Sequence, residues 1–132
     1  MNCPKCKGVM SKSLFEGVEY DRCAACDGLW FDALEKEHLA EMSNSESIDT
    51  AAKPADASDD RHLLCPVCRT LMIPMTVHGH PQLRYESCTV CFGAFFDAGE
   101  FREYKTATTE GETGLLAILK GLVGANAHPT SR

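Results

Sequence analysis

Apolar and polar residues alternate in two stretches of the chain. In the first stretch, Val18 and Tyr20 alternate with polar residues after a turn at residues 16–17. In the second, residues 83–86 show the same alternation, and an apolar segment at residues 75–77 precedes them. A spacing of two between apolar side chains places them on one face of a strand. Each stretch therefore predicts a β-hairpin.

A short helix is predicted after each hairpin. In both places an aspartate is followed three residues later by a glutamate, which is the spacing of a capping box with the aspartate as N-cap. We expect the first helix to end near residue 42 and the second within residues 105–108. Capping also explains these paired carboxylates without acid–base catalysis. The pairs are Asp32 with Glu35 and Asp97 with Glu100.

The remaining segments have different patterns. Residues 43–62 are rich in Ser, Ala and Asp, contain Pro54 and lack apolar periodicity, so we interpret them as a flexible acidic linker. Residues 110–132 carry apolar side chains at helical spacing, which predicts a short helical tail. The chain then divides into folded units at 1–42 and 63–109, the linker and the tail. The apolar tail residues are Leu115, Leu116, Ile118, Leu119, Leu122 and Val123.

All eight cysteines lie in C-x-x-C pairs, and the pairs repeat. The first pairs of the two units are 62 positions apart and the second pairs 65, so the second unit has three extra residues. We place them at the hairpin tip, residues 78–82, because insertions are tolerated there. The histidines are interpreted as surface residues: His38, His62, His78, His80 and His128. The cysteine pairs are Cys3 and Cys6, Cys23 and Cys26, Cys65 and Cys68, and Cys88 and Cys91.

Four cysteines in each unit predict a structural metal site. Two residues between paired cysteines let both sulfurs face one ion, and a hairpin brings the two pairs together. Residues 7–22 separate the pairs in the first unit and residues 69–87 in the second, which suits a zinc ribbon. Units of about 45 residues are also close to the size at which a fold needs a metal or a disulfide. We therefore predict two Zn²⁺ per chain, bound by the eight cysteines.

Iron and disulfides are the alternatives to zinc. Two C-x-x-C pairs also hold iron in rubredoxin-like sites, so iron stays open. A disulfide framework needs an oxidising compartment, and the first residues show no secretory signal. No apolar run reaches the roughly 18 residues that a membrane span needs. We expect a cytoplasmic protein without a membrane segment, and four thiolates per metal argue against catalysis there.

Glycines and aromatic residues accompany the cysteine pairs. Gly8, Gly28 and Gly93 lie two positions after a second cysteine, where we expect the turning chain to need unusual φ angles. Aromatic side chains in both units are candidates for stacking on bases, but we favour a core role. These aromatic residues are Trp30, Phe31, Phe95, Phe96, Tyr20 and Tyr85.

These residues resemble the transcription factor IIB-type zinc ribbon. The shared order is C-P-x-C, a hairpin, C-x-x-C and then Gly-x-aromatic-Phe-Asp-x-x-Glu, and the resemblance covers about residues 1–42 and 63–105. The second copy has Phe95 where the first has Trp30, and it has Gly99 within the capping box. The resemblance implies a small metal-stabilised α+β fold of two tandem ribbons, each with two zinc knuckles, a hairpin and a short helix. It implies zinc and leaves the biological process open.

Three functions are consistent with these features. The first is a non-enzymatic module that binds a protein partner, of which a transcription-associated factor is one form, with residues 113–124 as a cap or a homo-oligomer contact. The second is nucleic-acid binding, against which the net charge of -6 argues, because proteins that grip phosphates are basic. The third is a rubredoxin-like electron carrier or a thiol-based redox sensor.

Overall fold

The computed structural model describes residues 1–50 and 62–108, which form two repeated units called here lobe one (1–50) and lobe two (62–108). Lobe one contains β1 (Met10–Phe15), β2 (Val18–Cys23), β3 (Leu29–Phe31), α1 (Glu35–Glu41) and the short 3-10 helix η1 (Ser45–Ile48). Lobe two contains β4 (Ile73–Val77), β5 (His80–Ser87), β6 (Ala94–Phe96) and a second helix at residues 100–108. The predicted small α+β fold of two tandem ribbons is confirmed.

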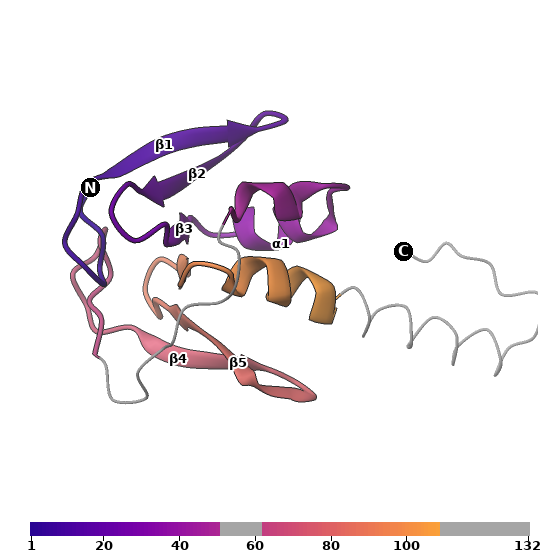
Figure 1. The fold of residues 1–132 in the computed structure, drawn as a ribbon. Helices are drawn as coiled ribbons and strands as arrows, with labels where there is room; N and C mark the ends of the chain where they lie inside the picture. Colours follow the sequence, from indigo (N-terminus) through magenta and orange to yellow (C-terminus); the bar gives the residue numbers. More distant parts are fainter. Residues whose placement is uncertain (51–61, 109–132) are drawn as a thin grey trace, which may run out of the picture.

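The two lobes share one antiparallel sheet with the strand order β1-β2-β3-β6-β5-β4. In its centre β3 pairs with β6, so that Trp30 lies opposite Phe95 and Leu29 lies opposite Phe96. Figure 1 shows the two hairpins diverging from this centre, with both helices between them and the cysteine loops of the two lobes together at the other end. The lobes therefore form one body through a continuous sheet.

The central strands bury side chains on both faces of this sheet. Leu29 and Phe31 point to the face covered by the helices, where they join Phe96 and Phe101 in a mostly aromatic cluster. Trp30 and Phe95 point to the opposite face, among the first cysteine of each of the four pairs. All four aromatic residues of β3 and β6 are fully buried, and Tyr20 and Tyr85 are 7% exposed. The predicted core role of the aromatic residues is confirmed.

The two hairpins turn differently from one another. The first turns at Glu16 and Gly17, whose φ angles of 49° and 88° suit a two-residue turn that matches the strand twist. The second turns at His78 and Gly79, while residues 80–82 belong to β5. The prediction that residues 78–82 all lie in the tip was therefore wrong, because a register shift between Thr76 and Val77 takes up the extra length within the strands.

The segment after α1 also differs from the prediction. Residues 43–62 were expected to form a flexible linker, but residues 45–48 form η1 and Asp49 is 2% exposed. The Asp49 carboxylate accepts hydrogen bonds from the N–H groups of Gly99 (2.7 Å) and Arg102 (3.0 Å), at the start of the second helix. Arg22 of β2 donates to the carbonyl of Ile48. The chain from Ser45 to Asp49 is thus held between the lobes, while residues 51–61 lie outside the described part.

The helix starts do not have the predicted N-caps. α1 begins at Glu35 with Leu34 in the N-cap position, at φ 73° and without a side-chain cap. One half of the capping box forms, because the N–H of Asp32 donates to Glu35 Oε1 at 2.9 Å. In lobe two the residue equivalent to Leu34 is Gly99, with φ 87°. Both helices therefore follow a residue in the left-handed conformation. Gly99 adopts this conformation without the steric strain that a side chain would add.

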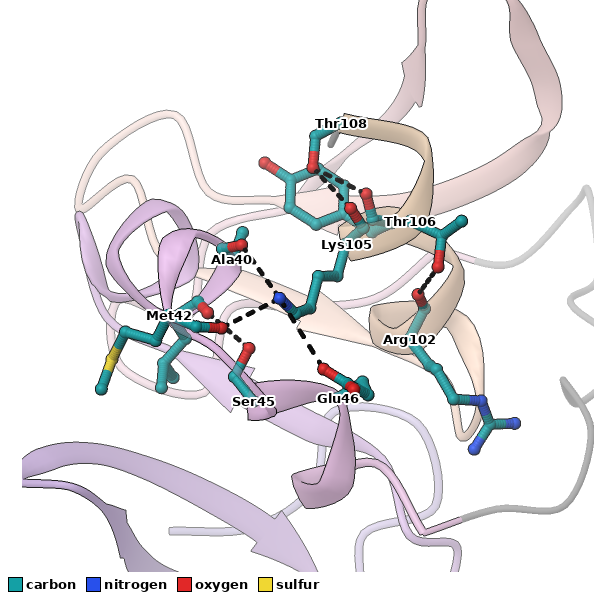
Figure 2. Close-up of polar contacts among 10 residues, drawn as sticks. Ala40, Met42, Ser45, Glu46, Arg102, Lys105, Thr106 and Thr108 are labelled. Carbon is teal, nitrogen blue, oxygen red and sulfur yellow. Dashed lines mark hydrogen bonds and ion pairs between the residues drawn. The ribbon is translucent and has the colours of Figure 1, made fainter. Parts of the chain in front are cut away.

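Lobe two also caps the end of α1. Lys105 Nζ, on the second helix, donates to the carbonyl oxygens of Met42 (2.9 Å) and Ala40 (3.5 Å) and lies 3.7 Å from Glu46 Oε1 (Figure 2). A cation is favourable at a helix C-terminus, where carbonyl groups lack partners within the helix. Each lobe thus supplies a charged group to one helix end of the other.

Two further sequence predictions concern the C-terminal tail and a membrane segment. The helical tail at residues 110–132, with its contact at 113–124, lies outside the described residues. Within residues 1–50 and 62–108, no helix is long and apolar enough to cross a membrane.

Candidate metal centres

The four cysteines of lobe one converge at the end of the sheet away from the helices. Their sulfur atoms all lie within 4.8 Å of one another. Cys3 Sγ lies 3.8 Å from Cys26 Sγ, and Cys6 Sγ lies 3.4 Å from Cys23 Sγ. Each short distance joins one cysteine of the first pair to one of the second. β1 and β2 connect the two pairs and hold them face to face.

The four cysteines of lobe two form the same cluster. Their sulfur atoms also lie within 4.8 Å of one another, and Cys65 Sγ lies 3.7 Å from Cys91 Sγ. The first cysteine of each pair is buried in both lobes, whereas Cys6 is exposed and the other second cysteines are half-buried. The structure therefore brings together the two groups of four that the spacing predicted.

These sulfur–sulfur distances fit a tetrahedral metal site. Bonds of about 2.3 Å from zinc to four sulfurs give tetrahedron edges of about 3.8 Å. The shortest contacts are 3.4–3.8 Å, far longer than a disulfide bond of about 2.05 Å, and all eight cysteines are free thiols. The arrangement suits a metal bound by four thiolates and not a disulfide framework.

Backbone N–H groups of the knuckles point at the sulfurs. In lobe one the N–H groups of Lys5 and Gly8 donate to Cys3 Sγ and Cys6 Sγ, both at 3.4 Å. In lobe two the N–H groups of Val67 and Cys68 donate to Cys65 Sγ at 3.4 and 3.2 Å. Such donors favour the charged thiolate, which is the form that binds metal.

The thiol pKa values diverge within each cluster. Burial alone would raise the pKa of Cys23, but N–H groups of its own knuckle lower it to about 7. Burial raises the pKa of Cys26 well above its usual range and that of Cys91 to about 12. In Cys88 hydrogen bonds led by the Thr70 hydroxyl outweigh burial and lower the pKa to about 6. A metal must therefore displace protons from some of these thiols, and its affinity falls as the pH falls.

The glycines after the cysteine pairs have a different role from the one predicted. The left-handed residue of each knuckle precedes the glycine position and is Lys7, Asp27, Arg69 or Phe92, with φ between 62° and 69°. A Cβ on Gly28 would lie 2.5 Å from the Phe95 ring, and a Cβ on Gly93 would lie 2.3 Å from the Trp30 ring. Each of these glycines makes room for the aromatic side chain of the other lobe.

The other candidate residues do not join the metal clusters. His78 is exposed, and His80 is half-buried at a cleft of about 390 Å³ that Arg102 and Glu103 also line. His38 and His62 are exposed, and His128 lies outside the described residues. Among the described residues, the two groups of four cysteines are the sets whose ligand atoms converge on one point.

The aspartates of the two predicted capping boxes bind groups other than the helix N–H groups. Asp32 Oδ1 accepts a hydrogen bond from Trp30 Nε1 at 3.1 Å. Asp97 is fully buried, and its Oδ1 lies 3.0 Å from Nζ of Lys5, which belongs to the first knuckle of lobe one. This ion pair joins the lobes beside the metal clusters. The sequence patterns did not predict this ion pair. The one sequence difference that hinted at it is that lobe two has Phe95 where lobe one has Trp30, so the indole donor to the aspartate is absent from lobe two.

One known protein family matches part of the chain. Residues 2–42 match the family model described as a transcription factor zinc-finger, which is a zinc ribbon of the transcription factor IIB type. The matched residues include the whole cysteine cluster of lobe one together with β1, β2, β3 and α1. No curated protein and no solved structure matches the chain significantly.

Lobe two lies outside the matched range but has the same local geometry as the zinc ribbon of lobe one. Its hairpin, short strand, helix and four converging thiols follow in the same order. The zinc-ribbon family match at residues 2–42 and the second group of four cysteines support a metal-binding module, with zinc as the metal that the matched family favours.

Proposed function

We propose that this chain is a non-enzymatic protein with two structural zinc sites that hold a rigid double ribbon. The convergence of four thiols in each lobe carries the proposal. The ligands in lobe one are Cys3, Cys6, Cys23 and Cys26. The ligands in lobe two are Cys65, Cys68, Cys88 and Cys91. Four thiolates complete a tetrahedral shell and leave no position for a substrate or a reactive water, so the metal stabilises the fold and does no chemistry.

The proposed role of the rigid body is to bind a protein partner. The net charge of -6 argues against a grip on phosphate backbones. Thiols that bind zinc persist in a reducing compartment, so we place the protein in the cytoplasm. A role beside the transcription machinery is one form of this proposal, and it rests on the family match of lobe one.

Metal analysis tests the proposal directly. Protein purified without added metal should contain two zinc ions per chain and be colourless. A red protein that contains iron would replace the proposal by a rubredoxin-like electron carrier. Oxidised thiols without metal would replace it by a disulfide scaffold.

Partner binding is tested separately, with the metal-loaded chain as bait in affinity capture. The control bait is a variant in which Cys23 and Cys88 are both replaced by serine. Proteins retained by the folded bait and lost with the control support an interaction module. Identical retention by both baits would contradict it.

A further inference from the structure

A groove lies between the first knuckles of the two lobes. It has a volume of about 210 Å³. Its lining consists of equivalent residues of the two lobes, 62 positions apart: the first cysteine of each lobe, Asn2 with Leu64, Pro4 with Pro66, and Lys7 with Arg69. Figure 1 shows these two loops side by side at the end of the molecule opposite the helices. The groove exists only because the lobes share one sheet.

Two side chains that line this groove have a charge opposite to that of the chain as a whole. Lys7 and Arg69 are both exposed and line it from opposite lobes, and the described residues that line it include no carboxylate. The chain as a whole has a net charge of -6. The knuckle N–H groups that donate to the sulfurs offset part of the thiolate charge inside each knuckle. The two cations therefore face solvent in an otherwise acidic molecule.

The backbone holds both cations in the same unusual conformation. Lys7 has φ 69° and Arg69 has φ 66°, a region where glycine is favoured and other side chains are strained. The knuckle fixes this geometry, because the N–H of each residue donates to the carbonyl of the first cysteine at 3.0 Å and 2.9 Å. Lys7 Nζ also donates to the carbonyl oxygen of Pro4 at 3.5 Å, a long contact within its own knuckle. Glycine would suit the backbone at both positions.

Exposed aliphatic residues flank the two cations. Leu64 lines the groove and is 46% exposed, and Val67, within the same knuckle, is 56% exposed. Leu71 pairs with Leu64 in an isolated bridge and is 53% exposed. Val9 has the equivalent place in lobe one and is 67% exposed. An apolar border around two cations suits a ligand that combines carboxylates with aliphatic side chains.

We propose that this groove is the docking site for an acidic protein segment that carries aliphatic residues next to its carboxylates. Lys7 and Arg69 pair with the carboxylates, and Leu64, Val67 and Leu71 contact the aliphatic side chains. The proposal rests on the proposed function as an interaction module and names its surface and the chemistry of its partner. A nucleic acid would also meet the two cations, but it would not use the aliphatic border.

The test is a selection of random peptides from a display library on the metal-loaded full chain. Selected peptides should be enriched in Asp or Glu beside Leu, Ile or Val. Their affinity should fall about tenfold in the double variant Lys7→Gly, Arg69→Gly, and also as salt rises, because exposed charge pairs are screened. Glycine suits the left-handed backbone at both positions, so this variant should keep its two metals and its melting temperature. Lys12→Gln is the control, because Lys12 is an exposed lysine outside the groove.

Each other outcome overturns the docking proposal in a recognisable way. Peptides whose binding is unchanged in the double variant would leave the interaction module in place and move its surface elsewhere. A selection without acidic enrichment would reject the partner chemistry. Binding of a single-stranded oligonucleotide that competes with the selected peptides and depends on Lys7 and Arg69 would replace the protein partner by a nucleic acid. If the metal analysis finds no zinc, that result contradicts the proposed function itself, before the docking site is tested.

Discussion

Lobe one and lobe two repeat one backbone but stabilise an equivalent carboxylate differently. In lobe one the exposed Asp32 accepts a hydrogen bond from the indole of Trp30. In lobe two the residue equivalent to Trp30 is Phe95, whose side chain has no N–H group, and the equivalent carboxylate, Asp97, is fully buried. Lys5 of lobe one reaches across to Asp97. Lobe two therefore has, beside its equivalent carboxylate, a cation that belongs to the neighbouring lobe.

The helices show the same dependence between the lobes. Asp49 of lobe one caps the start of the second helix, and Lys105 of lobe two caps the end of α1. The two central aromatic residues, Trp30 and Phe95, each occupy space left by a glycine of the other lobe. These contacts predict that the two lobes fold as one cooperative unit, and variants at them should show whether the lobes can be separated.

The largest expected effect is loss of metal from one lobe. Cys23→Ser and Cys88→Ser should each destroy one zinc site and unfold both lobes, because the lobes share a sheet and an aromatic cluster, so that both zinc ions are lost. Structural zinc contributes roughly 10–16 kcal/mol to folds of this kind near neutral pH. Zinc content and the dispersion of amide signals in an NMR spectrum measure the effect. A variant in which the untouched lobe keeps its dispersed signals would show that the lobes fold independently.

The next effect comes from the glycines that admit the facing aromatic rings. Gly93→Ala should destabilise the protein most, because its Cβ would lie 2.3 Å from Trp30 and 3.1 Å from the Phe31 carbonyl oxygen. Gly28→Ala, 2.5 Å from Phe95, should follow, and we expect about 2–3 kcal/mol for each from overpacking. Denaturant unfolding measures the free energy.

Gly8→Ala is the control for this series. Its Cβ would lie 3.1 Å from the Cβ of Ala25 and 3.3–3.4 Å from the sulfurs of Cys6 and Cys23. These contacts are looser than those at Gly28 and Gly93, so the expected loss is below about 1 kcal/mol. Equal losses for Gly8, Gly28 and Gly93 would mean that these glycines serve backbone conformation, as the sequence first suggested, and not the contact between lobes.

Sequence patterns predicted the parts of the molecule that depend on local periodicity. The alternation around Val18 and Tyr20 predicts the first hairpin, and the C-x-x-C spacing predicts the two groups of four thiols. The helix ends were also close, since α1 ends at Glu41 and helix is described to residue 108 in lobe two. Each of these features is fixed by residues near one another in the chain or by a repeated ligand motif.

The contacts between the lobes could not be predicted in the same way. Asp49 lies in a segment whose composition suggests a linker, and its role depends on the start of a helix 50 residues later. The pairing of β3 with β6 joins two three-residue strands, which are too short to show a period. Contacts between residues of different lobes leave no pattern in the local sequence. The role of Gly28 and Gly93, which make room for an aromatic ring of the other lobe, could therefore be recognised only from the structure.

A smaller effect is expected from the ion pair between the lobes. Lys5→Met should destabilise the protein by about 1–3 kcal/mol, because Asp97 is fully buried and loses a charged partner, while the 30% exposure of Lys5 moderates the loss. Lys12→Met is the control, since Lys12 is 58% exposed and its carboxylate partners lie at 3.7–3.9 Å. The control should cost less than about 0.5 kcal/mol. Equal costs would show that Asp97 does not depend on lobe one.

The smallest expected effect is a stabilisation, and it comes from a substitution at the start of α1. It tests whether the two helix starts are equivalent. Leu34 is 77% exposed and has φ 73°, whereas its equivalent in lobe two is Gly99. Leu34→Gly relieves a left-handed backbone that costs a non-glycine residue about 1 kcal/mol, removes little packing, and adds some entropy to the unfolded chain. We expect a gain of about 0.5 kcal/mol, measured as a shift of the denaturation midpoint at unchanged slope. The reciprocal change, Gly99→Ala, should destabilise, because φ 87° is strained for alanine. If Leu34→Gly instead weakens the fold, the Leu34 side chain makes a contact that its exposure does not reveal, and the equivalence of the two helix starts does not extend to their energetics.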